Sequence, residues 1–219
     1  MIRAAAFVLA SALAVGVAPG FRGRQVDRLP TRARQVALTI DAGGDPGGGW
    51  RILRTLVRRH ATATFFFTGR FARQNPRLAR AVASRFPIGN HTWSHPYMTR
   101  LSSSLVSGQI RRGAEAIRAV TRHDPRPLFR FPYGDANSRT IRIANGLGYV
   151  AVGWTTDSAG WLPGQTVAAA VRRVAAGLRP GAIVLMHIGP PVDTRALPLV
   201  LDLIRRRGYT FMTLEALTR

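Results

Sequence analysis

Cysteine is absent from this chain of 219 residues. Its absence excludes a disulfide-stabilised scaffold, a cysteine nucleophile, an iron–sulfur cluster and a thiolate zinc site. Acidic residues are scarce, with 10 Asp and Glu against 32 Lys and Arg, which gives a formal net charge of +22. Because 46% of the residues are hydrophobic, the chain can fill the core of one domain, and this composition excludes an intrinsically disordered protein.

Lysine is also absent, so all 32 basic residues are arginine. One explanation is attraction to a polyanion such as nucleic acid, anionic lipid or an acidic cell-wall polymer. The other is the codon bias of a GC-rich genome, which the complete lack of lysine favours. The arginines are spread along the chain without a basic helix, so we predict no nucleic-acid partner. A cationic surface would still favour electrostatic association with an anionic cell envelope.

The first 20 residues have the layout of a secretory signal. Arg3 precedes an apolar run that extends from residue 4 to 18, and small residues follow it. This run is short for a membrane span, which needs about 20 apolar residues, although an uncleaved anchor is the alternative. We therefore expect a secreted or envelope-associated protein. Residues 21–34 are rich in arginine and aperiodic, which predicts a linker, with the folded domain over 35–219.

Short apolar segments alternate with helical patterns through the rest of the chain. Strands are predicted at 36–40, 63–67, near Ile88, and at 128–131, 149–152, 182–186 and 209–212. Helices are predicted at 50–60, 75–85, 103–122, 139–147, 167–178 and 194–207. This alternation predicts a parallel α/β architecture, and both an open doubly wound sheet and a closed barrel fit it. No Gly-x-Gly-x-x-Gly follows a strand, so no nucleotide site is predicted.

Polar residues that can carry chemistry follow several of the predicted strands. They are Asp41, His91 and His95, Arg130, Asp157, and His187. The carboxyl ends of parallel strands share one face of an α/β fold, and active sites form there. The sequence therefore predicts one site built from these side chains, whereas His60 and His123 lie among arginines and are interpreted as solvated.

His91 and His95 are spaced four residues apart, which on a helical turn places both imidazoles on one face. Two neutral imidazoles and one carboxylate, with a position left for water, make a catalytic metal site. His187 ends an apolar strand, and it is either a satisfied buried histidine or a general acid. Arg130 precedes a rigid Pro-Tyr-Gly turn that can direct backbone N–H groups at an oxyanion, and its guanidinium can grip a carboxylate in bidentate fashion. The alternative for that segment is an ordinary loop with a surface arginine.

Five motifs, in order, resemble those of the polysaccharide deacetylase family, the NodB-homology group of carbohydrate esterases. They lie at Thr39–Gly43 (Thr-Phe-Asp-Asp-Gly in the family), His91–His95 (His-Ser/Thr-x-x-His), Arg130–Gly134 (Arg-x-Pro-Tyr-Gly), Asp157–Trp161 (Asp-Trp preceded by an acidic residue, present only in part) and Leu185–His187 (Leu-x-His). The resemblance implies a distorted (β/α) barrel, with about seven parallel strands here, that removes acetyl groups from polysaccharides by a metal-dependent reaction.

The resemblance also implies a role for each matching residue. Asp41 would be the general base and His187 the general acid, while His91 and His95 would bind a divalent metal. Zinc is the default metal for such ligands, and cobalt or nickel would fit the same set. The remaining implied roles are the orientation of Asp41 by Arg130, an oxyanion contact from the backbone N–H of Tyr133, and an acetyl pocket lined by Trp161 and Leu185.

Two residues depart from the family pattern. Ala42 stands where the family has its carboxylate ligand, and we predict that Asp45, three residues on, turns back to the metal; the alternative is a weaker site with two histidines and water. Gly160 stands where the family has the acidic residue that tunes the motif-five histidine. We predict that Asp157 substitutes for it; otherwise His187 would be a poorer acid.

The expected function is removal of N-acetyl groups from a polymer that contains N-acetylglucosamine, either peptidoglycan or a chitin-like polysaccharide. A non-catalytic glycan-binding protein, which kept the barrel and lost the metal at Ala42, is the alternative from another class. Hydrolysis of a small cyclic amide is a third hypothesis, which an export signal disfavours.

Overall fold

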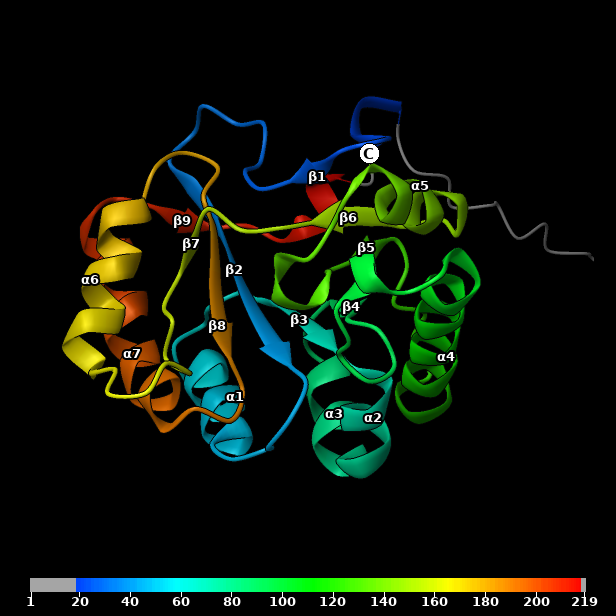
Figure 1. Ribbon diagram of the computed structural model, residues 1–219. Helices are drawn as coiled ribbons and strands as arrows, with labels where there is room; N and C mark the ends of the chain where they lie inside the picture. Colours follow the sequence, from blue (N-terminus) through cyan, green and yellow to red (C-terminus); the bar gives the residue numbers. More distant parts are fainter. Residues whose placement is uncertain (1–18, 218–219) are drawn as a thin grey trace, which may run out of the picture.

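Parallel strands form the centre of the molecule, as Figure 1 shows for residues 19–217, the part of the chain that the computed structural model describes. The strands are β1 (Gln25–Val26), β2 (Gln35–Ala42), β3 (Thr64–Phe67), β4 (Ile88–Asn90), β5 (Leu128–Phe129), β6 (Val150–Val152), β7 (Thr156–Asp157), β8 (Ile183–His187) and β9 (Thr210–Phe211). Their order is β1-β6-β5-β4-β3-β2-β8-β7, and β9 pairs with β2. Every strand pairing is parallel, as predicted.

The sheet curls into a distorted barrel because one stretch of chain joins both sides of it. Residues 150–157 carry β6, which pairs with β5 and β1, and then β7, which pairs with β8. The segment after β1 makes a second link, an antiparallel bridge between Arg28 and Ala182, the residue directly before β8. The predicted α/β barrel is therefore confirmed.

Helices surround the strands on the outside of the barrel (Figure 1). They are α1 (Gly49–Arg58), α2 (Gly69–Gln74), α3 (Pro76–Ala83), α4 (Ser103–Thr121), α5 (Ser138–Gly146), α6 (Val167–Gly177) and α7 (Pro191–Arg206), with short 3-10 turns at Pro19–Phe21, Met98–Arg100, Pro132–Gly134 and Leu214–Leu217. The predicted helices correspond to α1 and α3 to α7, while α2 was not predicted. None of the helices within residues 19–217 is long and apolar enough to cross a membrane.

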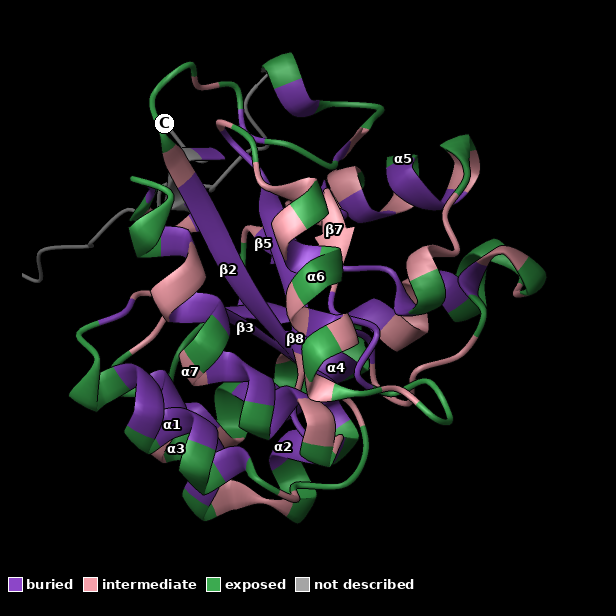
Figure 2. Cartoon of the chain, turned by 90° about the vertical axis from the view of Figure 1, so that its left-hand side faces the viewer, coloured by how far each residue is buried: buried purple, intermediate pink, exposed green. Residues whose placement is uncertain are grey.

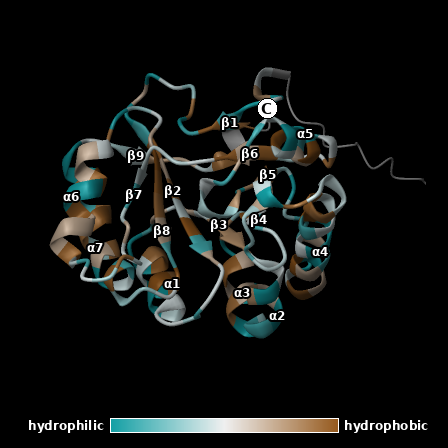
Figure 3. Ribbon diagram, in the orientation of Figure 1, coloured by the Kyte–Doolittle hydropathy of each residue, from teal (hydrophilic) through white to brown (hydrophobic). Residues whose placement is uncertain are grey.

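Side-chain alternation along the strands divides the core into two layers. In β2, Leu38 and Ile40 face the helices, and Ala37 lies in the apolar cluster inside the barrel. In β3, Phe65 and Phe67 pack toward the helices, whereas Phe66 points inward. Figure 2 shows strands β2, β3, β5 and β8 as largely buried, β7 as intermediate, and the helices as buried on one side only. Figure 3 shows the corresponding change from hydrophobic to hydrophilic residues. The fold is thus held by amphipathic helices on an apolar barrel.

The prediction that residues 21–34 form a linker is wrong. Val26 lies in β1, and Leu29 is only 1% exposed, packed in the inner apolar cluster. The backbone N–H of Leu29 also donates to the carbonyl of Gly181 over 2.8 Å. Two isolated apolar residues among arginines show no periodicity, so the sequence pattern gave no sign of this strand. The predicted signal segment falls mostly on residues 1–18, outside the described part of the chain.

Burial of Leu29 predicts that this segment stabilises the domain. Replacing Leu29 by Ala should lower the free energy of unfolding by about 3 kcal/mol, because it removes a buried side chain and leaves a cavity. Urea denaturation followed by circular dichroism measures the loss. Arg32→Ala, at an exposed position of the same segment, should change the stability by no more than about 0.5 kcal/mol. Equal, small effects of both substitutions would restore the linker interpretation.

Candidate functional site

The residues predicted to carry chemistry gather around one cavity of about 690 Å³. Strands β2, β4 and β8 deliver Asp41, His91 and His187 there, because their carboxyl ends meet at one end of the barrel. Nine of the ten predicted site residues line the cavity: Asp41, Asp45, His91, His95, Tyr133, Asp157, Trp161, Leu185 and His187. The tenth, Arg130, lies beneath Asp41, fully buried.

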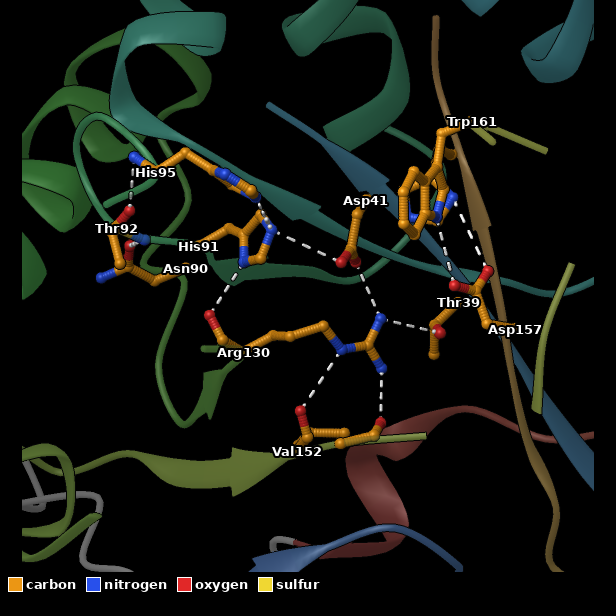
Figure 4. Close-up of polar contacts among 12 residues, drawn as sticks. Thr39, Asp41, Asn90, His91, Thr92, His95, Arg130, Val152, Asp157 and Trp161 are labelled. Carbon is orange, nitrogen blue, oxygen red and sulfur yellow. Dashed lines mark hydrogen bonds and ion pairs between the residues drawn. The ribbon is translucent and has the colours of Figure 1, made fainter. Parts of the chain in front are cut away.

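Arg130 and Asp41 form an ion pair inside the barrel (Figure 4). One terminal nitrogen of the guanidinium donates to Asp41 Oδ1 over 2.7 Å and to Thr39 Oγ1 over 2.9 Å. The other nitrogens donate to backbone carbonyls, those of Val152 over 3.3 Å and Gly153 over 2.8 Å. The predicted bidentate contact is therefore wrong. Only one guanidinium nitrogen donates to the carboxylate, and the other two donate to backbone carbonyls of the barrel.

The register of β2 explains why this pair forms. Thr39 and Asp41 are two residues apart, so both side chains point into the barrel, where the guanidinium lies 4.2 Å from the centre of the Phe66 ring. Burial by itself would raise the pKa of Asp41. The positive charges of Arg130, and those that His91 and His187 can carry, outweigh burial and hold the pKa of this carboxyl below its ordinary value. Asp41 is therefore ionised at neutral pH.

The two histidines of the second motif lie in a loop after β4, and not on the helical turn that their spacing predicted. Thr92 and His95 have positive φ angles of 73° and 64°. Two hydrogen bonds hold this tight loop, from Thr92 N–H to Asn90 Oδ1 and from His95 N–H to Thr92 Oγ1, each of 3.0 Å. This loop brings the Nε2 atoms of His91 and His95 to 3.1 Å from each other.

Both histidines are prepared to act as neutral ligands. The Nδ1 atom of His91 lies 2.8 Å from the carbonyl oxygen of Arg130, which as an acceptor places the proton on Nδ1 and leaves the lone pair on Nε2. Burial lowers the pKa of His91, and burial together with His91 lowers the pKa of His95 to about 4. Two neutral imidazoles with converging nitrogens fit a divalent cation, and this pair is the part of the predicted metal site that the structure supports.

The third ligand of the predicted metal site is not in place. Asp45 is exposed, and its Oδ1 accepts a hydrogen bond of 2.8 Å from the backbone N–H of Gly47. Its carboxylate is thus engaged with its own loop, and the structure does not bring it to His91 and His95. Among the described residues, no group of three or more His, Cys, Asp and Glu side chains has the arrangement of a metal site. The nearest carboxylate oxygen is Asp41 Oδ2, 3.4 Å from His91 Nε2.

His187 lies beside two carboxylates at the end of β8. Its Nδ1 is 3.3 Å from Asp193 Oδ2 and 4.0 Å from Asp157 Oδ1. Burial lowers the pKa of His187, but the hydrogen bond to Asp193 and the charges of Asp41, Asp157 and Asp193 outweigh it and raise the pKa above its ordinary value. The predicted substitute, Asp157, is a neighbour of His187, but the closer carboxylate belongs to Asp193, which the sequence analysis missed.

One signal in the sequence points to Asp193. It is one of only ten acidic residues, and it follows His187 by six positions. The predicted helix began at Thr194, whereas α7 begins at Pro191, so Asp193 lies in its first turn. Because the connection between β8 and α7 is short, the side chain of Asp193 lies beside His187. The sequence does not show this proximity, and the fold does.

Aromatic side chains form the rim of the cavity. Trp161 is 55% exposed, and its Nε1 donates to Asp157 Oδ2 over 3.2 Å. Tyr133 is 57% exposed, lies edge-on to His95, and stacks on Tyr97 with ring centres 4.2 Å apart. Leu185, only 2% exposed, contributes an apolar part of the lining. The cavity therefore combines polar groups inside with large exposed rings at its mouth, as ligand clefts do.

Comparisons with known proteins show which family the chain resembles. Residues 28–152 match a family model described as polysaccharide deacetylase. The chain is 32% identical over 194 residues to the peptidoglycan-N-acetylglucosamine deacetylase PgdA of Listeria monocytogenes, covering 88% of this chain and 40% of that protein. It is 34% identical over 175 residues to the chitooligosaccharide deacetylase of Sinorhizobium fredii, covering 79% of this chain and 80% of that protein. The chain thus spans less than half the length of the Listeria relative.

A solved structure of similar fold is a family 4 carbohydrate esterase pseudoenzyme from Bacillus anthracis. Its TM-score is 0.84 with 28% identity, over 90% of this chain and 69% of that one. The fold is therefore shared with a protein described as a pseudoenzyme of that esterase family.

Loss of Arg130 should destabilise the domain more than loss of an exposed arginine. Arg130→Ala leaves the carboxylate of Asp41 buried without its partner, so the free energy of unfolding at pH 7 should fall by about 3–5 kcal/mol. The double variant Asp41→Asn/Arg130→Ala should recover part of this loss, because no buried charge then remains unpaired.

Arg126→Ala is the matched control. Arg126 pairs with Asp124 over 2.5 Å on the surface, with 44% and 38% of the two side chains exposed. Its loss should cost less than about 1 kcal/mol. Equal costs for the two arginines, or no recovery in the double variant, would show that the pair in the barrel is not a main source of stability.

Proposed function

The chain belongs to the polysaccharide deacetylase family, and on that premise we propose that it is a metal-dependent hydrolase of cell-wall polysaccharide. It removes N-acetyl groups from N-acetylglucosamine units of peptidoglycan or of a chitin-like polymer. One observation carries the proposal: an ionised Asp41 beside the converging nitrogens of His91 and His95 shares one cavity with His187, whose pKa is raised. A base and an acid with separated pKa values in one cleft suit amide hydrolysis.

His91 and His95 would hold the metal, most simply zinc. A divalent metal supplies Lewis-acid polarisation of the acetyl carbonyl and lowers the pKa of water, which an amide needs because it resists water at neutral pH. The chain's own contribution is to keep both imidazoles neutral and oriented, through burial and through the carbonyl of Arg130.

Asp41 and His187 would move the protons. Asp41 takes a proton from the attacking water, and Arg130 keeps it ionised for that step. Water adds to the acetyl carbonyl carbon, the carbon–nitrogen bond breaks, and His187 gives its proton to the departing amine. The products are acetate and the free amino sugar. The backbone N–H of Tyr133 would stabilise the negative oxygen that develops on the carbonyl.

The rim of the cavity supports a sugar polymer as substrate. Trp161 and Tyr133 expose more than half of their side chains at its mouth, where their rings can lie against the apolar faces of sugar units. Leu185 and Trp161 would line the pocket for the acetyl methyl group. The Listeria and Sinorhizobium relatives are named for peptidoglycan and for chitooligosaccharides, and both polymers carry the same N-acetylglucosamine unit.

We also propose that the protein is exported and works at the cell envelope. The signal-like first 20 residues and the net charge of +22 support this, because an anionic wall attracts a cationic protein.

A catalytically impaired glycan-binding protein is the second candidate. Two observations favour it: Ala42 removes the carboxylate ligand of the first motif, and a structure of similar fold is a pseudoenzyme.

Acetate release separates the two candidates. The metal-loaded protein should release acetate from peptidoglycan or chitin oligomers, and Asp41→Asn should lower the rate more than about 100-fold because the base is lost. Asp124→Asn, at an exposed position, should keep the wild-type rate. Acetate is measured enzymatically, and glycan binding by sedimentation with insoluble polymer. Binding without acetate release at any metal loading would overturn the hydrolase and establish the binding protein.

Metal content tests the ligand assignment separately. Purified protein dialysed against zinc should hold about one ion, and His95→Ala should lose it because one of two imidazole ligands is gone. Asp45→Asn should keep the metal, because that carboxylate bonds to Gly47. Elemental analysis by mass spectrometry reports both. Loss of zinc in Asp45→Asn would show that the loop turns toward the histidines when the ion binds.

A further inference from the structure

Gly160 lies against a carboxylate that belongs to another element. A Cβ atom built on Gly160 would overlap the carboxylate of Asp193, at 2.5 Å from its Cγ atom. Any side chain at position 160 would therefore enter the space that Asp193 already fills. Position 160 is also where the family pattern places an acidic residue, so this chain has a carboxylate at that point in space but supplies it from α7.

Asp193 is fully buried and is directed at His187. Its Oδ2 accepts a hydrogen bond of 2.8 Å from the backbone N–H of His187 and lies 3.3 Å from Nδ1 of the same residue. Its Oδ1 is buried and has no hydrogen-bond partner among the described residues. A buried carboxylate with an unpaired oxygen is costly, and a neighbouring cation offsets that cost. Its only ion pair within residues 19–217 is with His187.

The other charged groups around His187 are engaged elsewhere. Asp157, on β7, accepts from the backbone N–H of Ala159 over 2.7 Å and from Trp161. Asp41, on β2, is held by Arg130. The loop after β4 contributes His91 and His95, whose imidazoles are neutral at pH 7. Of the three carboxylates around His187, Asp193 is thus the one that neither pairs with an arginine nor accepts a hydrogen bond from a described residue other than His187.

We propose that Asp193 is the positioning residue for His187. It fixes the proton on Nδ1, orients the ring so that Nε2 faces the cavity, and supplies from α7 the negative charge that position 160 lacks. This inference rests on the proposed hydrolase function, in which His187 protonates the leaving amine. Asp193 acts through His187 and does not touch the substrate.

The substitution Asp193→Asn removes the negative charge of the side chain but keeps its volume and one carbonyl oxygen that can accept a hydrogen bond. In the metal-loaded protein, kcat for acetate release should fall at least about tenfold, with KM within about twofold of the wild type. An acid acts while protonated, so activity is lost as the pH rises through its pKa. Removing the carboxylate lowers that pKa, so the alkaline limb of the kcat profile should move to lower pH.

Asp202→Asn is the matched control on the same helix. Asp202 pairs with Arg59 on the surface, so its loss should leave kcat and the pH profile unchanged. A wild-type kcat and an unmoved alkaline limb in Asp193→Asn would overturn the proposal, as would a change confined to KM. Thermal denaturation of each variant shows whether a loss of kcat comes from unfolding.

An exchange of positions gives a second, independent test. Gly160→Asp alone should fold poorly, because its side chain collides with Asp193. In Gly160→Asp/Asp193→Ala the new carboxylate fills the vacated space, so kcat should exceed that of Asp193→Ala by at least about tenfold. No gain in a double variant that folds would show that the carboxylate is not what Asp193 provides. Failure of the hydrolase function itself would differ, because then the wild type would release no acetate.

Discussion

The ion pair between Arg130 and Asp41 is the interaction on which the rest of the site depends. A carboxylate inside an apolar barrel is stable only if a cation shares its burial, and Arg130 in turn needs carbonyl acceptors for its remaining nitrogens. Strand β6 and the residue after it provide those carbonyls, and the carbonyl of Arg130 itself orients His91. Asp41, its counter-ion Arg130 and the imidazole of His91 are therefore a single hydrogen-bonded unit (Figure 4).

Strand periodicity and the position of polar residues after strands predicted most of this arrangement. The seven predicted strands all occur, and Asp41, His91 and His187 meet because parallel strands end on one face. Such local patterns are reliable where a long buried strand such as β2 dictates the direction of each side chain. The i, i+4 spacing correctly predicted that His91 and His95 lie together, but the reason differs. They lie in a loop that is closed by residues with positive φ, and not on a helical turn.

What the sequence could not predict depends on contacts between distant segments. Strand β1 has two residues and is defined by its pairing with β6, which lies more than 100 positions later. Asp45 is the nearest acidic residue after Ala42. The conformation of its loop, however, directs its carboxylate to the backbone N–H of Gly47, from which it accepts a hydrogen bond. Asp193 reaches His187 only because the chain turns sharply between β8 and α7. Counting charges near a motif does not reveal which of them the fold turns inward.

The stretch from residue 150 to 157 has a consequence for how the protein can change over evolutionary time. Its first part supplies the carbonyl groups that accept hydrogen bonds from the guanidinium of Arg130, and its last part ends in Asp157, next to His187. Because one short extended run contacts both Arg130 and His187, an insertion or a register slip there would displace both side chains together. Lineages that diversify this scaffold should therefore vary in the outer helices and rim loops, while the length of this run stays constant.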